Sequence, residues 1–481
     1  MPQAVASWCR QLGHQVFYAT YYGQDDPQRL LPDDLDVVFV GAFTRASALA
    51  YALATLFRKA GATTVLGGPH ARAFPEDSLR FFDVVIQDCD KALIGDLLRG
   101  HFDPPAILSS GRALTDIPGI EERMADIAAS AFYQGRPRRT TQVPVLSSVG
   151  CPYTCDFCVD WNNSYVRVPA ERLRADLDYL SRRWPRVLVA YHDPNFGVQF
   201  DQTLEVIESI PEGRRNPYGM ESSLSILKDD RLERLQRSHC VFIAPGVESW
   251  ADYSNKSGTG FRTGRDKLER VVEHFGRIRQ HVQGLQANFV FGTEADRGRE
   301  PVDLIKEFIR RTPYLWPGIN IPVPIGGTPL FDRYLAEGRI LRSMPFAFYY
   351  LPYLTIVPIH YHPREYYDRL IEIYSELTSL RMWQRRLTNG AHPAMRFIHS
   401  LQAFAAHQDL ADLRRIRRRF DTDADILAFH EMRTDTLPAF YRHEFQQRLG
   451  PYAELLAPKD AVPYVPTARR VEERQRSNSR G

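Results

Sequence analysis

The feature that most constrains the fold of this chain is a repeated alternation of short apolar segments with longer segments of helical periodicity. In residues 1–105 the apolar segments have the length of strands and are separated by turn residues, which is typical of βαβ units. We predict strands over 15–19, 36–41, 63–66 and 83–86. Alternating strands and helices fold into a parallel sheet with helices on both faces. The first 105 residues therefore predict a doubly wound, flavodoxin-like α/β domain.

A second alternation occupies residues 141–340 and contains six strand–helix units. Its predicted strands are 143–148, 186–192, 218–222, 241–247, 286–291 and 318–322. Residues 106–140, between the two alternations, have weak periodicity and predict a linker. Residues 341–460 predict a C-terminal helical region, with helices over 365–379, 394–419 and 437–449. Residues 461–481 are charged and rich in Ser and Arg, so we expect a disordered tail.

Three cysteines follow the first strand of the second alternation, in the run Gly150-Cys151-Pro152-Tyr153-Thr154-Cys155-Asp156-Phe157-Cys158. Their C-x3-C-x2-C spacing lets three thiolates hold three corners of one cubane cluster, which leaves one iron open for a small molecule. A zinc site is the alternative, but it usually needs two cysteine or histidine pairs, and Cys9, Cys89 and Cys240 are isolated. A disulfide framework is disfavoured in so long a chain with so few cysteines. We predict that Cys151, Cys155 and Cys158 bind a [4Fe-4S] cluster.

Composition narrows the class of protein further. The formal net charge is +3, from 61 basic and 58 acidic residues, so no extended nucleic-acid-binding surface is indicated. No run of 18 apolar residues is present, and the N-terminus lacks the pattern of a signal peptide. We therefore expect a cytoplasmic protein without a membrane span, in the reducing compartment that an oxygen-sensitive cluster needs.

The cysteine triplet, with Phe157 directly before its third cysteine, resembles the cluster motif of the radical S-adenosylmethionine (radical SAM) superfamily. The resemblance implies that the second alternation is a partial (β/α)6 barrel and that SAM chelates the open iron through its amino and carboxylate groups. It also implies that Phe157 belongs to the cofactor-binding site. Such an enzyme reductively cleaves SAM at the cluster, so it needs an electron donor such as flavodoxin or ferredoxin. The motifs occur in order over about residues 1–360, and this combination is more specific than any one of them.

Polar residues at the ends of the predicted barrel strands occur where this superfamily contacts SAM. The run His192-Asp193-Pro194-Asn195-Phe196 resembles a D-D-x-F motif, and Gly246-Val247-Glu248-Ser249 resembles a G-x-E-S element. A carboxylate there can accept charge-assisted hydrogen bonds from the SAM ammonium group. The SAM-binding residues that the resemblance implies are Asp193, Asn195, Glu221, Glu248, Ser249 and Asn288. The alternatives are a plain Asx-Pro turn at 193–195, an acid stabilised by a helix N-terminus at 248, and an ordinary apolar strand at 288–292.

The first 105 residues resemble the cobalamin-binding-like domain that precedes many radical SAM domains. The resemblance rests on Ser47-Ala48-Leu49, Gly67-Gly68-Pro69-His70 and Asp83-Val84-Val85. This sequence begins after the position of that domain's first strand and of its D-x-H-x-x-G loop, whose histidine can ligate cobalt. We expect either a misassigned start or a truncated domain. Cobalamin is thus the candidate third cofactor. We expect Gly67 and Gly68 to give it backbone clearance and no histidine of this domain to bind cobalt. The alternative is a tight turn without a ligand, in a domain that serves only as a structural lid.

The resemblance implies radical chemistry on a small or lipid-like metabolite, by methylation, cyclisation or rearrangement, with or without cobalamin. Methylthiolation of RNA or protein fits less well, because no second cysteine triplet and no basic terminal module are present. A non-catalytic iron–sulfur protein for electron transfer or redox sensing is the other alternative. Such a protein would usually supply a fourth cysteine and would not need polar residues at the strand ends.

Overall fold

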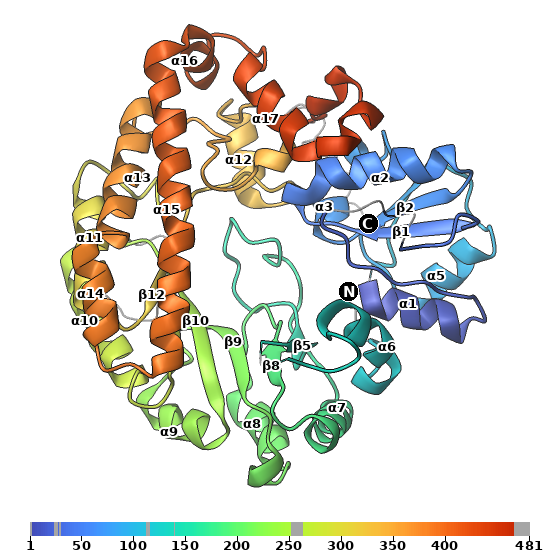
Figure 1. The fold of residues 1–481 in the computed structure, drawn as a ribbon, viewed down its shortest axis with the longest axis horizontal. Coiled ribbons are helices and arrows are strands. Elements are labelled where there is room, and N and C mark those ends of the chain that lie inside the picture. The colour runs from blue at the N-terminus through green and yellow to red at the C-terminus, as the bar shows by residue number, and fades with distance from the viewer. Residues whose placement is uncertain are drawn as a thin grey trace.

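The computed structural model describes residues 2–23, 27, 30–111, 116–138, 140–251 and 263–465. Two parallel sheets are set side by side, and helices cover them and connect them at the top of the molecule in Figure 1. The chain that follows the first strand of the second sheet lies in the middle of this arrangement. The cysteine triplet is part of that central segment.

The N-terminal sheet has the strand order β1-β2-β3-β4, and all its strands are parallel. The strands are β1 (Val37–Gly41), β2 (Thr63–Gly67), β3 (Val84–Ile86) and β4 (Ala106–Leu108). Leu66 belongs to the same buried core as side chains of α2 (Ser47–Lys59) and α3 (Pro69–Ala73), and α4 (Pro75–Ser78) contacts β3. Val65, on the opposite face, packs with side chains of α1 (Pro2–Gln11) and α5 (Lys91–Leu98). Helices on both faces confirm the doubly wound fold.

Two predictions for the first 140 residues are wrong. Residues 15–19 form no strand, because among the described residues β1 pairs only with β2 and leaves this segment without a neighbouring strand. The predicted linker contains β4 and the helix α6 (Ile120–Ala131). Ile120 and Ile127 of α6 are fully buried, and Asp126 accepts a hydrogen bond of 2.8 Å from Arg10 of α1. Tertiary packing therefore stabilises a helix whose sequence periodicity is weak.

The second sheet has the order β12-β11-β10-β9-β8-β5 and is also parallel throughout. Its strands are β5 (Gln142–Val145), β8 (Leu188–Tyr191), β9 (Tyr218–Ser223), β10 (Cys240–Glu248), β11 (Gly284–Val290) and β12 (Trp316–Asn320). Its outer helices are α7 (Ala170–Arg183), α8 (Phe200–Glu208), α9 (Asp229–Arg237), α10 (Gly264–Ile278) and α11 (Glu300–Arg311). This order confirms the partial (β/α)6 barrel.

Alternate residues of the barrel strands face opposite sides of the sheet. Val189, Met220, Ile243 and Phe289 belong to the buried core under the outer helices. The strand register places small and polar residues on the inner face instead: Ala190 pairs with Gly219, Ala244 with Glu221, and Gly246 with both Ser223 and Asn288. The inner face of the sheet therefore carries small and polar residues.

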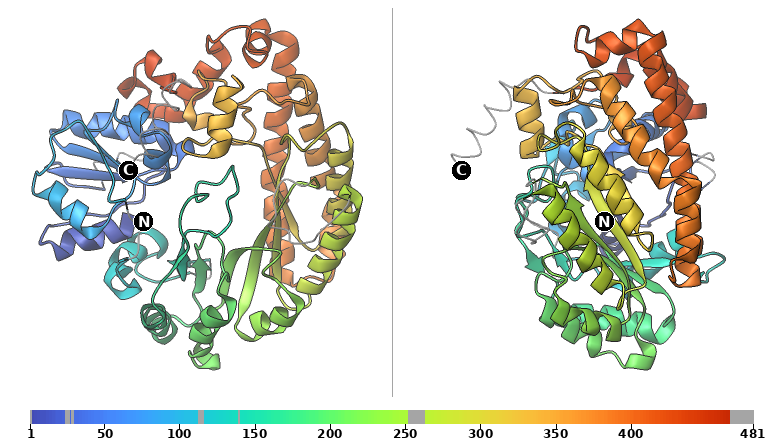
Figure 2. Two further views of the ribbon diagram at one scale, coloured as in Figure 1. Left: turned by 180° about the vertical axis from the view of Figure 1, so that it is seen from behind. Right: turned by 90° about the vertical axis from the view of Figure 1, so that its left-hand side faces the viewer.

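The C-terminal region is helical, as predicted. The helix α12 (Pro329–Ala336) precedes this region. The helices of the region are α13 (Pro363–Leu377), α14 (Leu380–Thr388), α15 (Pro393–Thr422), α16 (Ala424–His430) and α17 (Ala439–Leu449). The sequence did not predict α14 and α16. The long helix α15 runs along the edge of the molecule in the right-hand view of Figure 2. No helix among the described residues is long and apolar enough to span a membrane.

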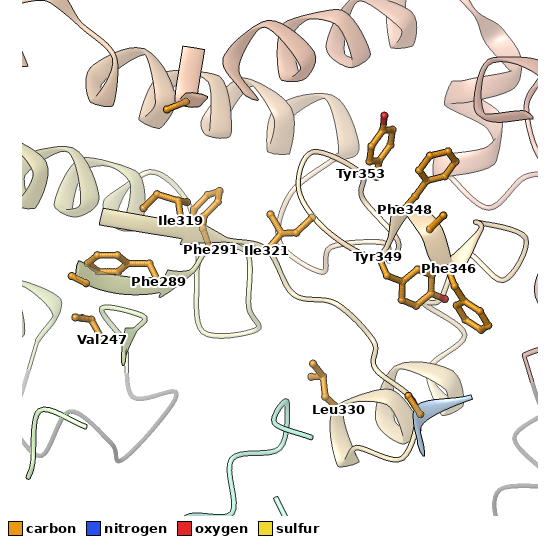
Figure 3. Close-up of a cluster of buried hydrophobic side chains, with 14 of the residues drawn as sticks. Val247, Phe289, Phe291, Ile319, Ile321, Leu330, Phe346, Phe348, Tyr349 and Tyr353 are labelled. Atoms are coloured by element: carbon orange, nitrogen blue, oxygen red, sulfur yellow. The ribbon is translucent and has the colours of Figure 1, made fainter. Parts of the chain in front are cut away.

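A buried aromatic cluster connects the barrel with the N-terminal domain. Figure 3 shows it extending from Phe289 and Phe291 on the barrel to Phe346 and Tyr349. Phe346 stacks on Phe74 of the N-terminal domain with ring centroids 3.8 Å apart. At the C-terminus Val465 is buried, and residues 466–481 of the expected tail lie outside the described residues.

Candidate active site

The cysteine loop, residues 150–165, is closed at its base by the short antiparallel strands β6 (Ser148–Val149) and β7 (Val166–Arg167). Gly150 begins the loop with a φ of 71°, a conformation that favours glycine. A Cβ atom at Gly150 would also lie 2.2 Å from the carbonyl oxygen of Ser164. The glycine before the first cysteine is therefore required by the close approach of the two sides of the loop.

The backbone of the loop holds the three cysteines in a compact turn. The Cys151 N–H donates to the Asn163 carbonyl at 3.1 Å, and the Cys158 N–H donates to the Cys155 carbonyl at 3.1 Å. The Asp160 N–H points at the Cys158 sulfur from 3.5 Å, a contact that tunes thiolates in iron–sulfur sites. Cys151 is buried, whereas Cys155 and Cys158 are partly exposed.

In a cubane cluster each thiolate binds a different iron atom, whereas the ligands of a zinc site converge on one ion. Cys151, Cys155 and Cys158 remain the predicted ligands of a cluster. Phe157, next to Cys158, is half-buried and packs against the main hydrophobic core.

Two other parts of the chain clamp the cysteine loop. From the N-terminal domain, Arg72 on α3 donates a 2.6 Å hydrogen bond to the side-chain oxygen of Asn163. From the other side, Arg333 of α12 donates to Asp156 at 2.9 Å, and the Trp161 indole donates to the Gly327 carbonyl at 2.8 Å. The loop is thus fixed at the junction of the N-terminal domain, the barrel and α12.

The turn before α12 contains two glycines, in the run Pro324-Ile325-Gly326-Gly327-Thr328, and close packing requires the first of them. A Cβ atom at Gly326 would lie 2.0 Å from the carbonyl oxygen of Ala73, the last residue of α3. Gly326 therefore lets this turn pack directly on α3.

Asp193, predicted as a SAM ligand, is only 2% exposed and anchors the base of the cysteine loop. It accepts hydrogen bonds from the Ser147 N–H at 2.9 Å, the Ser147 hydroxyl at 2.6 Å and the Ser148 hydroxyl at 2.5 Å. Burial raises the pKa of the Asp193 carboxyl, and the bonds from the two serines oppose that shift. The residue connects the end of β8 with the chain that enters the cysteine loop.

Glu221, Glu248 and Asn288 belong to three neighbouring strands and lie on their inner face. Glu221 on β9 is exposed on this face, and Asn288 on β11 is paired with Gly246 of β10. A Cβ atom at Gly246 would lie 2.1 Å from Glu248 Oε1, so the Glu248 side chain folds back over the inner face. The missing side chain of Gly246 provides the space for this carboxylate.

The backbone at Glu248 is strained and supported from outside the barrel. Glu248 has a φ of 66°, at a position where the register between β10 and β11 shifts. The buried Lys267 ammonium donates to the carbonyls on either side, those of Val247 at 3.1 Å and Ser249 at 2.5 Å. Backbone strain that surrounding groups maintain is common at functional sites.

Ser249, another predicted SAM-binding residue, makes its side-chain hydrogen bond within the protein. Its hydroxyl donates to Asp296 Oδ1 at 2.9 Å, and the backbone N–H groups of Gly292 and Thr293 donate to Asp296 Oδ2 at 2.9 and 3.0 Å. Burial raises the pKa of the Asp296 carboxyl. This network fixes the loop after β11 to the end of β10.

Asn195 is the predicted residue with the most unusual surroundings. It is 2% exposed, and neither its amide nitrogen nor its amide oxygen has a hydrogen-bond partner within the described structure. Buried amides are normally paired, because an unsatisfied one costs about 1–3 kcal/mol per group. An orphaned amide after β8 is what a binding site for a polar ligand leaves when the ligand is absent.

The carboxyl edge of the N-terminal sheet supplies the other predicted site. A Cβ atom at Gly67 would meet nothing within 4 Å, so this glycine adjoins open space. Gly68 has a φ of 86°, and a Cβ atom there would lie 3.3 Å from the backbone of Ala42. Packing inside the N-terminal domain therefore accounts for this glycine without a ligand. His70 is fully buried, with Nε2 2.6 Å from the Tyr51 hydroxyl and Nδ1 3.4 Å from Thr44.

Residues that position this site and were not predicted include Arg72, Asn163, Lys267, Asp296 and Arg333. Each acts through a contact with another segment of the chain, as Arg72 and Asn163 illustrate. Only Asn163 had a local signal, since it lies a few residues after Cys158.

Comparison with known proteins agrees with this geometry. Residues 145–300 match the model of the radical SAM superfamily. The chain is 23% identical over 402 residues to bacteriochlorophyllide d C-8(2)-methyltransferase of Chlorobaculum tepidum, covering 79% of this chain and 85% of that protein. It is 24% identical over 206 residues to hopanoid C-2 methylase of Rhodopseudomonas palustris, covering 41% of this chain and 38% of that protein.

Among solved structures, the cobalamin-dependent SAM radical enzyme OxsB, with aqua-cobalamin bound, superposes with a TM-score of 0.55 at 12% identity. The superposition covers 98% of this chain and 77% of OxsB, so the two proteins share a fold. Residues 145–300 therefore form a radical SAM domain, and a doubly wound α/β domain precedes it in this chain. The protein is a radical SAM enzyme, and the superfamily's cofactors are a [4Fe-4S] cluster and SAM.

Proposed function

We propose that this enzyme transfers a methyl group to a carbon of a small, lipid-like metabolite, with cobalamin as its third cofactor. The observation that carries the proposal is the direct connection between the two cofactor regions. Helix α3 begins at the Gly67-Gly68 turn of the N-terminal sheet, and its Arg72 bonds Asn163 of the cysteine loop at 2.6 Å. The two curated relatives named above are methyltransferases by name, which favours methylation over cyclisation or rearrangement.

Cys151, Cys155 and Cys158 would hold the cluster. SAM would lie along the inner face beside Glu221, Glu248 and Asn288, with the orphaned amide of Asn195 as a further partner. When bound, these cofactors supply one-electron cleavage of SAM and a transferable methyl group on cobalamin. Asp193 and Ser249 would act through the backbone they hold, since their side chains already bond Ser147, Ser148 and Asp296.

The N-terminal domain fits a cobalamin that receives no histidine ligand from it. Its described histidines are His14 and His101, both exposed, and the buried His70. His70 is turned toward Tyr51 and Thr44 and packs against the ring of Phe346. Gly67 is the residue that would give clearance, since nothing lies within 4 Å of a Cβ atom there.

The protein would receive electrons from a small redox protein such as flavodoxin or ferredoxin. An oxygen-labile cluster also places it in the cytoplasm under this proposal. A non-catalytic electron-transfer role is not supported, because it explains neither the superfamily match nor the polar inner face.

Two substitutions test the cobalamin site. Gly67→Leu places a side chain in the open space beside the turn and should abolish uptake of hydroxocobalamin by the anaerobically reconstituted protein. Gly213→Leu is the matched control, because a Cβ atom at Gly213 also meets nothing within 4 Å and this residue lies in the barrel domain. Uptake is measured by absorption spectroscopy after gel filtration. Lack of uptake by the parent protein would support the structural-lid alternative instead.

The SAM site is tested separately by equilibrium dialysis. Glu248→Gln should weaken SAM binding about 10-fold or more, since a hydrogen bond to a charged group contributes about 1.5–3 kcal/mol. Ser249→Ala, at the neighbouring position, should leave SAM affinity within about twofold of the parent because its hydroxyl bonds Asp296. Turnover with reductant, SAM and cobalamin should release S-adenosylhomocysteine as well as 5′-deoxyadenosine. Release of 5′-deoxyadenosine alone would contradict methyl transfer.

A further inference from the structure

The first half of α15 has two apolar faces, and only one of them is covered. His399, Ala403 and Ala406 are buried on the inward face. On the other side, Phe397 is 65%, Leu401 56% and Phe404 68% exposed. These three residues recur at i, i+4 and i+7, so they form one stripe along the helix.

Helix α14, which packs beside α15, adds exposed apolar residues of its own. The α14–α15 surface is defined here by its exposed apolar residues, namely Leu380, Trp383, Phe397, Ile398, Leu401 and Phe404. Exposed apolar residues scattered singly need no explanation, but a contiguous helical stripe indicates an interaction surface.

The charge of this segment is one-sided. Residues 377–408, which contain the whole α14–α15 surface, include four arginines and no aspartate or glutamate, although the chain as a whole is nearly balanced. One of the four, Arg386, is buried and donates to the Leu377 carbonyl, so it is not part of the surface. Arg381 is exposed and Arg385 is partly exposed. Arg396 donates to the Ala391 and Leu387 carbonyls and so fixes the turn between the helices.

We propose that the α14–α15 surface docks on the surface of an anionic lipid bilayer. An amphipathic helix with aromatic and aliphatic residues on one face and arginines beside them binds at the headgroup level, and Trp is favoured at that depth. A second copy of the chain is a poorer occupant, because two such surfaces would bring arginines together without an acidic residue of the same segment to pair with them. Docking would not require a spanning helix, and it would give the enzyme access to an apolar metabolite in the membrane.

Vesicle co-sedimentation tests the proposal without turnover, so its result is independent of the proposed reaction. The full-length protein should bind vesicles of phosphatidylcholine with phosphatidylglycerol and should bind vesicles of phosphatidylcholine alone much more weakly. Binding to the anionic vesicles should fall as salt is added, because screening weakens surface charge. Arg381→Gln should lower the partition coefficient roughly fivefold, the equivalent of about 1 kcal/mol per Arg near an anionic surface.

The double substitution Phe397→Ser with Phe404→Ser should lower the partition coefficient at least about 10-fold, because each ring loses its burial in the headgroup region. Tyr22→Ser, at a residue 74% exposed in the N-terminal domain, is the matched control and should bind like the parent. Failure of the parent to bind anionic vesicles would overturn the proposal. A second result would also overturn the proposal: the parent forms a concentration-dependent dimer in analytical ultracentrifugation, and the double substitution abolishes the dimer but leaves vesicle binding unchanged.

Discussion

Replacing Asp193 separates an anchoring role from a direct role in SAM binding. In Asp193→Ala the Ser147 N–H and the hydroxyls of Ser147 and Ser148 lose their acceptor inside the protein. A buried donor left unsatisfied costs about 1–3 kcal/mol, so the loss of unfolding free energy should be about 3 kcal/mol or more. The base of the cysteine loop would loosen, and the cluster should be lost with it.

Asp193→Asn should behave differently, because it keeps one oxygen for the Ser147 N–H. Its amide nitrogen would occupy the position of Oδ2 and could donate to both serine hydroxyls, which can accept as well as donate. Burial already raises the pKa of the Asp193 carboxyl, so the site tolerates a neutral group. We expect the Asn variant to keep its cluster and to unfold within about 1 kcal/mol of the parent.

The assays are thermal unfolding, anaerobic iron and sulfide analysis, and SAM affinity by equilibrium dialysis. An anchoring Asp193 predicts near-parental SAM affinity for Asp193→Asn. If that variant keeps its cluster and stability but binds SAM at least about 10-fold more weakly, the carboxylate charge contacts SAM and the anchoring argument is refuted.

Three other predictions follow from the same structure. Cys155→Ala should lose the cluster, and a full four-iron content in that variant would exclude the three-cysteine site. Gly150→Ala should also fail to load iron, because its Cβ would lie 2.2 Å from the Ser164 carbonyl; normal loading would show that the loop can open without cost. The free energy of unfolding should fall as pH drops below about 6.5. Burial lowers the pKa of His70 to about 3 and that of His399 to about 4. Below about pH 6.5 these histidines therefore bind protons in the unfolded chain but not in the folded chain. His399→Leu should flatten this dependence in urea titrations at pH values from neutral to acidic, and an unchanged slope would contradict the assignment.

Periodicity was sufficient to predict most of the architecture. All six barrel strands were predicted from apolar segments such as the one around Phe289. Strands of a parallel sheet that helices cover are rich in apolar residues, so the sequence indicates their positions. Residues 15–19 look like a strand by the same criterion but form none, since a strand also needs a neighbour to satisfy its backbone. Helix α6 illustrates the opposite error, because its stability comes from packing on α1 and not from its own sequence.

Some predicted site residues anchor the backbone and others lie on the inner face of the barrel, and the sequence does not distinguish the two groups. Asp193 and Glu248 are both acidic residues at strand ends, yet Asp193 is bonded to serines of the loop base while Glu248 folds over Gly246 onto the inner face. The difference depends on which donors lie nearby in space, and those donors come from other parts of the chain.

The sequence by itself determined the class of chemistry, because the spacing of Cys151, Cys155 and Cys158 is local and thiolates have few other uses at that spacing. It also determined the parallel α/β order, because hydrophobic period is a property of consecutive residues. Only the tertiary structure decided how the cysteine loop is held, since Arg72 lies 91 residues before its partner Asn163, and Arg333 lies 177 residues after Asp156. Contacts of that kind depend on the packing of whole domains, which no short stretch of sequence specifies.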